Sequence, residues 1–132
     1  MAEDRILLID DEAHFVAATA KRLRRRGFSV LEATSGPEGL RLLDQEPVDA
    51  VVLDVGMPDM DGIQVLRELK MRFPQVQVLM LTGHGNMEVA ISGMAMGAFD
   101  YLMKPVELEV LVGKIREACA RRKKAGEGNG MV

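Results

Sequence analysis

The chain has 132 residues, 48% of them hydrophobic, and a net charge of -3, which fits one compact soluble domain. This balance excludes a wholly disordered chain and argues against direct nucleic-acid binding by the domain. Cys119 is the only cysteine, so no internal disulfide forms and a reducing, cytoplasmic location is expected. Neither a signal peptide nor an apolar run of the ~18 residues that a membrane span needs is present in the sequence.

Five short apolar runs predict β-strands along the chain. The first, third and fourth are nearly continuous in Val, Ile, Leu and Met, which is typical of strands buried on both faces of a parallel sheet. The five runs are Ile6–Ile9, Ser29–Glu32, Ala50–Leu53, Val76–Leu81 and Phe99–Leu102.

Segments with a helical period separate these runs and follow the last one. Gly27 and Gly97 are predicted to end the first and fourth helices, while Pro37 begins the second and Pro74 closes the third. Strict alternation of strands and helices predicts a doubly wound α/β sheet with helices on both faces. Residues 125–132 are Gly-rich and polar, so we expect one domain over residues 1–124 and a flexible tail or linker after it.

Polar residues stand where four of the five strands end. Asp10 and Asp11 follow the first strand, and Asp54 ends the third. Thr82 follows the fourth, and Lys104 follows the fifth. Because parallel strands end at one edge of the sheet, we expect these side chains to meet. Three carboxylates in contact repel one another unless a cation intervenes, and oxygen ligands without a His or Cys cluster favour Mg²⁺.

A metal, a hydroxyl and an ammonium around a carboxylate suit the handling of a phosphoryl group. Asp54 can attack phosphorus as a nucleophile and become an acyl phosphate. Lys104 and the metal offset charge on the phosphoryl oxygens, and Thr82 can donate a hydrogen bond to one of them. An Asp after a strand is usually only a helix cap, so the prediction depends on the whole set.

Four segments resemble the signature blocks of the response-regulator receiver (CheY-like) family. They are Ile9–Glu12, Leu53–Gly62, Leu81–His84 and Met103–Pro105. The resemblance runs from about Arg5 to Arg121 and implies a flavodoxin-like fold with strand order 2-1-3-4-5. It further implies that a histidine kinase or phosphotransfer protein supplies the phosphoryl group to Asp54. The family members are phosphoacceptor switches rather than enzymes, and assist their own phosphorylation and dephosphorylation.

The resemblance also implies a role for each matched residue in metal binding. Asp11 and Asp54 would ligate Mg²⁺ directly, together with the backbone carbonyl of Gly56. Asp10 would act mainly through bound water.

The resemblance assigns the switching of the domain to residues around the phosphoryl group. Lys104 would contact that group, and the Lys104–Pro105 peptide bond is typically cis in the family. Thr82 would move to meet the phosphate, and Tyr101, the switch aromatic residue, would turn inward as it does so.

Three further positions are expected to tune the lifetime of the acyl phosphate. Gly56 and His84 each lie two residues past a site residue, where the family varies its side chains. Gly83 is expected to leave open space beside the phosphoryl group. A simple turn glycine and an exposed loop histidine are the ordinary alternatives for Gly83 and His84.

The fourth helix is expected to expose apolar groups. Val89, Gly93 and Met96 are predicted to lie opposite its core stripe, and an interior glycine costs ~1 kcal/mol relative to alanine, which would make the helix easier to shift. We therefore predict that the fourth helix, the fifth strand and the fifth helix form an output or homodimer surface.

Two other function classes share some of these features. A haloacid-dehalogenase-type phosphatase usually carries a second Asp two residues after its nucleophile, where this chain has Gly56. An interaction module that is never phosphorylated would not need the acidic set. Within the receiver family, the chain could act alone as a phosphorelay receiver, or be the first domain of a longer regulator with an output domain.

Overall fold

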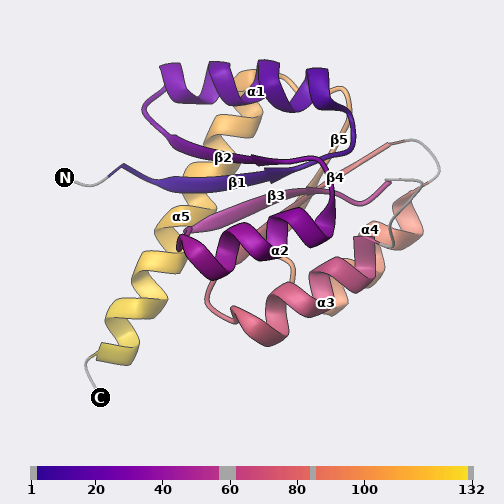
Figure 1. Cartoon of the computed structure of the whole chain (residues 1–132). Helices are drawn as coiled ribbons and strands as arrows, with labels where there is room; N and C mark the ends of the chain where they lie inside the picture. Colours follow the sequence, from indigo (N-terminus) through magenta and orange to yellow (C-terminus); the bar gives the residue numbers. More distant parts are fainter. Residues whose placement is uncertain (1–2, 57–61, 84–85, 131–132) are drawn as a thin grey trace.

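In the computed structural model of the chain, parallel strands form one sheet in the order β2-β1-β3-β4-β5 (Figure 1). The structure describes residues 3–56, 62–83 and 86–130, and only the backbone of residues 125–130. The strands are β1 (Arg5–Ile9), β2 (Ser29–Ala33), β3 (Ala50–Asp54), β4 (Gln77–Thr82) and β5 (Asp100–Met103). The helices are α1 (Ala13–Arg25), α2 (Gly36–Gln45), α3 (Gly62–Arg72), α4 (Met87–Ala95) and α5 (Leu108–Gly130). The α/β class and the strand order are confirmed.

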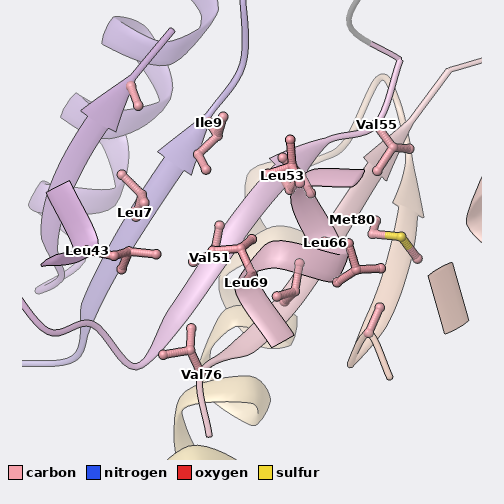
Figure 2. Close-up of a cluster of buried hydrophobic side chains, with 14 of the residues drawn as sticks. Leu7, Ile9, Leu43, Val51, Leu53, Val55, Leu66, Leu69, Val76 and Met80 are labelled. Carbon is pink, nitrogen blue, oxygen red and sulfur yellow. The ribbon is translucent and has the colours of Figure 1, made fainter. Parts of the chain in front are cut away.

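Alternate side chains of each central strand enter two separate hydrophobic cores. Leu7 and Ile9 of β1 face the core under α2, α3 and α4, which Figure 2 shows in close-up. Ile6 and Leu8 of the same strand face the core under α1 and α5. β1 is almost wholly buried and β3 and β4 are wholly buried, as their continuous apolar composition predicts. Burial on both faces fixes the position and direction of each central strand, and therefore also the positions of the residues at its carboxyl end.

The helix boundaries follow local chemistry. The Ser35 hydroxyl accepts a hydrogen bond from Glu38 N at 3.3 Å, and the Glu38 carboxylate accepts one from Thr34 N at 2.7 Å, which fixes the start of α2. Gly27 and Gly97 follow α1 and α4 with φ of 95° and 102°, a conformation that favours glycine. The predicted helix ends at these two glycines are therefore confirmed.

The face of α4 that meets the core differs from the prediction. Ala90 and Gly93 are buried, whereas Ile91 and Met94 are exposed by 62% and 38%. Gly93 lies so close to β4 that a Cβ there would collide with the thioether of Met80. The expected exposure of Val89, Gly93 and Met96 is thus wrong. The helix is apolar on nearly all sides, and its period alone does not select the inward face.

The last helix continues beyond the expected end of the domain. α5 runs to Gly130, so no change of secondary structure marks residue 124, and the division into a domain and a tail stays a prediction. In the part of the chain that the structure describes, no helix is both long and apolar enough to cross a membrane.

Candidate functional site at the carboxyl edge of the sheet

Three predicted acidic residues meet at the carboxyl ends of β1 and β3. The two strands are adjacent and parallel, with Ile9 opposite Leu53, so the residues that follow lie side by side. Asp10 and Asp54 are 2% and 6% exposed, whereas Asp11 is exposed. One carboxylate oxygen from each of the three lies within 4.8 Å of the other two. Such crowding of like charges is unfavourable unless a cation offsets it.

Lys104 reaches this group from the end of β5. Its Nζ lies 2.8 Å from Asp10 Oδ2 and 3.5 Å from Asp54 Oδ2. The Lys104–Pro105 peptide bond is cis, as the resemblance implies. Burial alone would lower the pKa of Lys104, but the hydrogen bond to Asp10 and the charges of Asp10 and Asp54 outweigh burial and raise it. The side chain is therefore a fixed positive charge beside both carboxylates.

Asp54 is held from two sides. Its Oδ1 accepts a hydrogen bond from Gly56 N at 2.9 Å, and its Oδ2 faces Lys104. Burial raises the pKa of Asp54 and the charge of Asp10 adds to this effect, while the Gly56 amide and Lys104 act in the opposite direction. The net pKa is above the ordinary value. An ionised Asp54 thus costs the folded protein free energy when no further cation is present.

Thr82 ends β4 beside this group. Its side chain is fully buried, and its Oγ1 has no hydrogen-bond partner among the described residues. A buried hydroxyl without a partner is rare in a folded protein, because its desolvation is then uncompensated. The backbone carbonyl of Thr82 accepts a hydrogen bond from Lys104 N at 2.7 Å, so the ends of β4 and β5 are tied together. The hydroxyl is a donor available to an oxygen of a ligand at this edge.

The acidic group fits a hard divalent cation. Three carboxylates converge there, and the exposure of Asp11 leaves room for water around an ion. Mg²⁺ prefers oxygen ligands and keeps several waters. The carboxylates of Asp10, Asp11 and Asp54 are the groups that could hold it.

The remaining predicted residues lie around this centre. Tyr101 is half-buried on β5 and packs against the core that contains Met80. Among the described residues, a Cβ at Gly83 would meet one atom within 4 Å, Asn86 Nδ2 at 3.8 Å. His84 lies outside the described residues.

Two residues that the sequence reasoning did not assign to the site lie at it. The ring of Phe15 on α1 has Lys104 Nζ 4.5 Å from its centroid, so an aromatic face helps to hold the ammonium. Asn86 lies beside Gly56, which is two residues past Asp54. An aromatic residue inside an amphipathic helix usually indicates core packing, and Asn86 precedes a helix, where Asn usually signals a cap. Neither signal points to a site.

The opposite edge of the sheet offers less specific features. A hollow of about 450 Å³ is lined by residues of the α2–β3 and α3–β4 connections and by Arg122, and none of the predicted site residues lines it. Asp4, Asp49 and Cys119 also lie close together there. Burial and the two nearby carboxylates raise the pKa of Cys119 to about 12, and Lys123 pairs with Asp4. A protonated thiol is a poor metal ligand, so this second cluster is a weaker candidate for a metal site. The candidate functional site is therefore identified by its converging polar groups and not by the size of a hollow.

Comparison with known proteins agrees with this geometry. A family model for the response regulator receiver domain matches residues 6–116. The chain therefore belongs to the response regulator receiver domain family, the phosphoacceptor part of two-component signalling proteins. A phosphatase function is not favoured.

Individual relatives extend this result. The chain is 39% identical to the transcriptional regulatory protein GlrR of Escherichia coli over 86% of its own length and 26% of that protein. It is 36% identical to the transcriptional regulatory protein PrrA of Mycobacterium tuberculosis over 89% of its length and 51% of PrrA. A crystal structure of a response regulator receiver domain protein from Clostridium thermocellum matches with a TM-score of 0.88 and 40% identity, covering 92% of this chain and 98% of the other. The chain thus spans a quarter to a half of these curated relatives.

Proposed function

We propose that Asp54 accepts a phosphoryl group from the phosphohistidine of a histidine kinase or phosphotransfer protein. The observation that carries this proposal is the position of Asp54, buried at the strand edge with Lys104 3.5 Å from one carboxylate oxygen and a carboxylate cluster around it. Among the acidic residues of the cluster, Asp54 alone also accepts the Gly56 amide. This contact occupies Oδ1 and leaves Oδ2, which faces Lys104, as the oxygen that attacks phosphorus.

Each neighbouring group has a separate task in this proposal. Lys104 draws the phosphoryl oxygens toward the site and offsets their charge. The Thr82 hydroxyl, which has no partner among the described residues, donates a hydrogen bond to one of those oxygens once the group is attached. Bound Mg²⁺ would neutralise charge that builds up on the transferred phosphoryl group. Domains of this kind are switches, and we propose that the chain has no separate substrate to turn over.

We further propose that phosphorylation is read on the surface formed by α4, β5 and α5. The described part of this surface exposes the apolar side chains Met87, Ile91, Met94, Met103 and Val110. Tyr101 on β5 is partly buried and packs against the core, and its ring would respond to a movement of Thr82. This surface would bind an output domain, a partner or a second copy of the chain. A phosphorelay receiver without an output domain would present the same surface to its partner.

The buried free thiol of Cys119 suits a reducing compartment, and we place the protein in the cytoplasm. Regulation of transcription, as in the names of GlrR and PrrA, would need the remaining length of such relatives.

Intact-mass measurement tests the metal-dependent part of the proposal. The protein is incubated with phosphoramidate, once with Mg²⁺ and once with a chelator. We expect one added phosphoryl group with Mg²⁺ and at least about 100-fold slower labelling with the chelator, because charge on the transferred group then lacks its main counterion. Equal labelling in both samples would contradict the proposal.

A further inference from the structure

Asn86 occupies a helix-capping position without acting as a side-chain cap. It precedes α4 as its N-cap residue, and its side chain makes no capping hydrogen bond. Asparagine is favoured at this position because its side-chain oxygen normally accepts a backbone N–H of the first turn. The carboxamide of Asn86 is therefore placed for some other contact.

The carboxamide lies beside the acidic group, in space that two glycines leave free. A Cβ at residue 56 would lie 2.8 Å from Asn86 Nδ2 and 3.5 Å from Asp54 Oδ1. A Cβ at residue 83 would lie 3.8 Å from the same nitrogen. Asn86 thus brings an amide from α4 into the place where a side chain of residue 56 would otherwise stand, next to the carboxylate of Asp54.

We propose that Asn86 is a further phosphoryl-contacting residue, whose Nδ2 donates a hydrogen bond to an oxygen of the phosphoryl group on Asp54. This inference rests on the proposed function of Asp54. Lys104 approaches Asp54 Oδ2, whereas a Cβ at residue 56 would lie near both Asn86 Nδ2 and Asp54 Oδ1, so the two donors would approach the group from different directions. A phosphoryl oxygen carries charge and accepts several such hydrogen bonds.

A donor at this place assists both transfers that Asp54 undergoes. During phosphorylation by acetyl phosphate, an Asp54 oxygen bonds to phosphorus, the bond from phosphorus to the acetate oxygen breaks, and acetate leaves. During decay, a water oxygen bonds to phosphorus, the Asp54–phosphorus bond breaks, and the carboxylate, inorganic phosphate and a proton are released. Both transition states spread negative charge over the three outer phosphoryl oxygens, so both gain from the same donor.

The placement also connects the chemistry to α4. Asn86 is the residue from which α4 begins, and Ile91 on the same helix is exposed. A hydrogen bond that forms only with the phosphoryl group would bias the position of the first turn of the helix. The same contact would then affect the rates of phosphoryl transfer and also transmit the phosphorylation of Asp54 to the exposed face of α4.

Two substitutions of Asn86 separate this role from helix capping. Asn86→Ala removes the amide and any capping ability, while Asn86→Ser removes the amide but keeps a preferred capping residue. We expect both to lower the rate constants of phosphorylation by acetyl phosphate and of acyl-phosphate decay by about tenfold, as for a lost donor to a charged group at a partly hydrated site. The exposed Ser92→Ala on the same helix should leave both rate constants unchanged. An Asn86→Ser protein with wild-type rate constants would overturn the proposal.

Gly56→Ala gives an independent test through the same amide. Gly56 does not have a positive φ, so alanine fits its backbone, and the new Cβ displaces Asn86 Nδ2. We expect Gly56→Ala to slow decay as much as Asn86→Ala does, and the double variant to be no slower than either. A double variant whose decay is slowed by the product of the two single effects would contradict the proposal.

A wild-type protein that is not labelled would instead refute the proposed function of Asp54. A normally labelled protein with unaffected Asn86 variants would refute only this inference.

Discussion

The two sides of the site are built differently. On one side, Asp10 directly follows β1 and Asp54 ends β3, and nearly all residues of these two strands are buried between two helix layers. On the other, β5 is only partly buried along its length, and α4 carries the exposed Ile91. Tight packing on both faces resists displacement of the acidic residues, whereas elements with fewer buried contacts move at lower cost. The acceptor thus stands on the rigid side, and the proposed readout stands on the side that can respond.

The largest expected effect concerns the residue that joins the two sides. Lys104→Met keeps the length of the side chain but removes the charge beside Asp10 and Asp54. We expect phosphorylation by acetyl phosphate to slow by about 100-fold, as for loss of one preorganised donor to a transition-state oxygen. Lys114→Met, which loses a partly exposed pairing with Asp100, is the matched control. Equal rates for the two variants would remove Lys104 from the chemistry.

A smaller effect tests how closely α4 packs against the core. Gly93→Ala places a methyl group against Met80 and Leu66, so we expect a loss of about 1–3 kcal/mol in the free energy of unfolding. Gly113→Ala on α5 meets open space, so the same change should stabilise the protein by about 0.5–1 kcal/mol. Urea unfolding of both variants provides the measurement. Stabilisation by Gly93→Ala would show that α4 is not held by this close approach.

The pH dependence of stability distinguishes a carboxylate whose ionisation destabilises the folded protein from one whose ionisation stabilises it. The raised pKa of Asp54, caused first by burial, means that its ionisation costs stability as pH rises through that pKa. Without metal, Asp54→Asn should therefore gain stability over the wild type as pH rises from about 4 to 7. The observation that would contradict this is a gain that shrinks over the same range.

Asp100 supplies the opposite case. Burial acts to raise its pKa, but the hydrogen bond from Lys114, the Tyr101 amide and the charge of Lys114 lower it overall. A carboxylate with a lowered pKa stabilises the folded state above the ordinary carboxyl range, and this contribution is lost as pH falls. Asp100→Asn should thus lose stability relative to the wild type as pH rises.

The smallest effect in the unmodified protein concerns the proposed readout surface. Ile91→Ser and Met71→Ser both replace exposed apolar side chains, on α4 and α3, so each should change stability by less than about 0.5 kcal/mol. We expect only Ile91→Ser to weaken self-association or partner binding of the phosphorylated protein, measured by sedimentation. A matching loss in Met71→Ser would move the readout away from the α4, β5 and α5 surface.

The rigid side of the site was also the side that the sequence predicted well. The apolar runs before Asp10 and Asp54 have one interpretation, because strands buried on both faces must be continuous in large apolar residues. Each predicted strand end lies within one residue of the observed one. Topology then brings Asp10, Asp11 and Asp54 together without further information.

The other side resisted prediction for physical reasons. α4 is apolar almost all round, so only the close approach of Gly93 to Met80 in three dimensions shows which face is inward. Asn86 precedes a helix, and a capping asparagine has the same sequence signal as one turned toward Gly56. That the Thr82 hydroxyl has no partner in the described part of the chain depends on packing between distant segments, which no local pattern contains.

The central claim is that Asp54, and no other carboxylate, takes the phosphoryl group. Asp49 precedes β3 at the opposite edge of the sheet, so Asp54→Asn and Asp49→Asn alter the two ends of one strand. After incubation with phosphoramidate and Mg²⁺, intact mass should show one added phosphoryl group on the wild type and on Asp49→Asn, and none on Asp54→Asn. Labelling of Asp54→Asn at the wild-type rate would contradict the account.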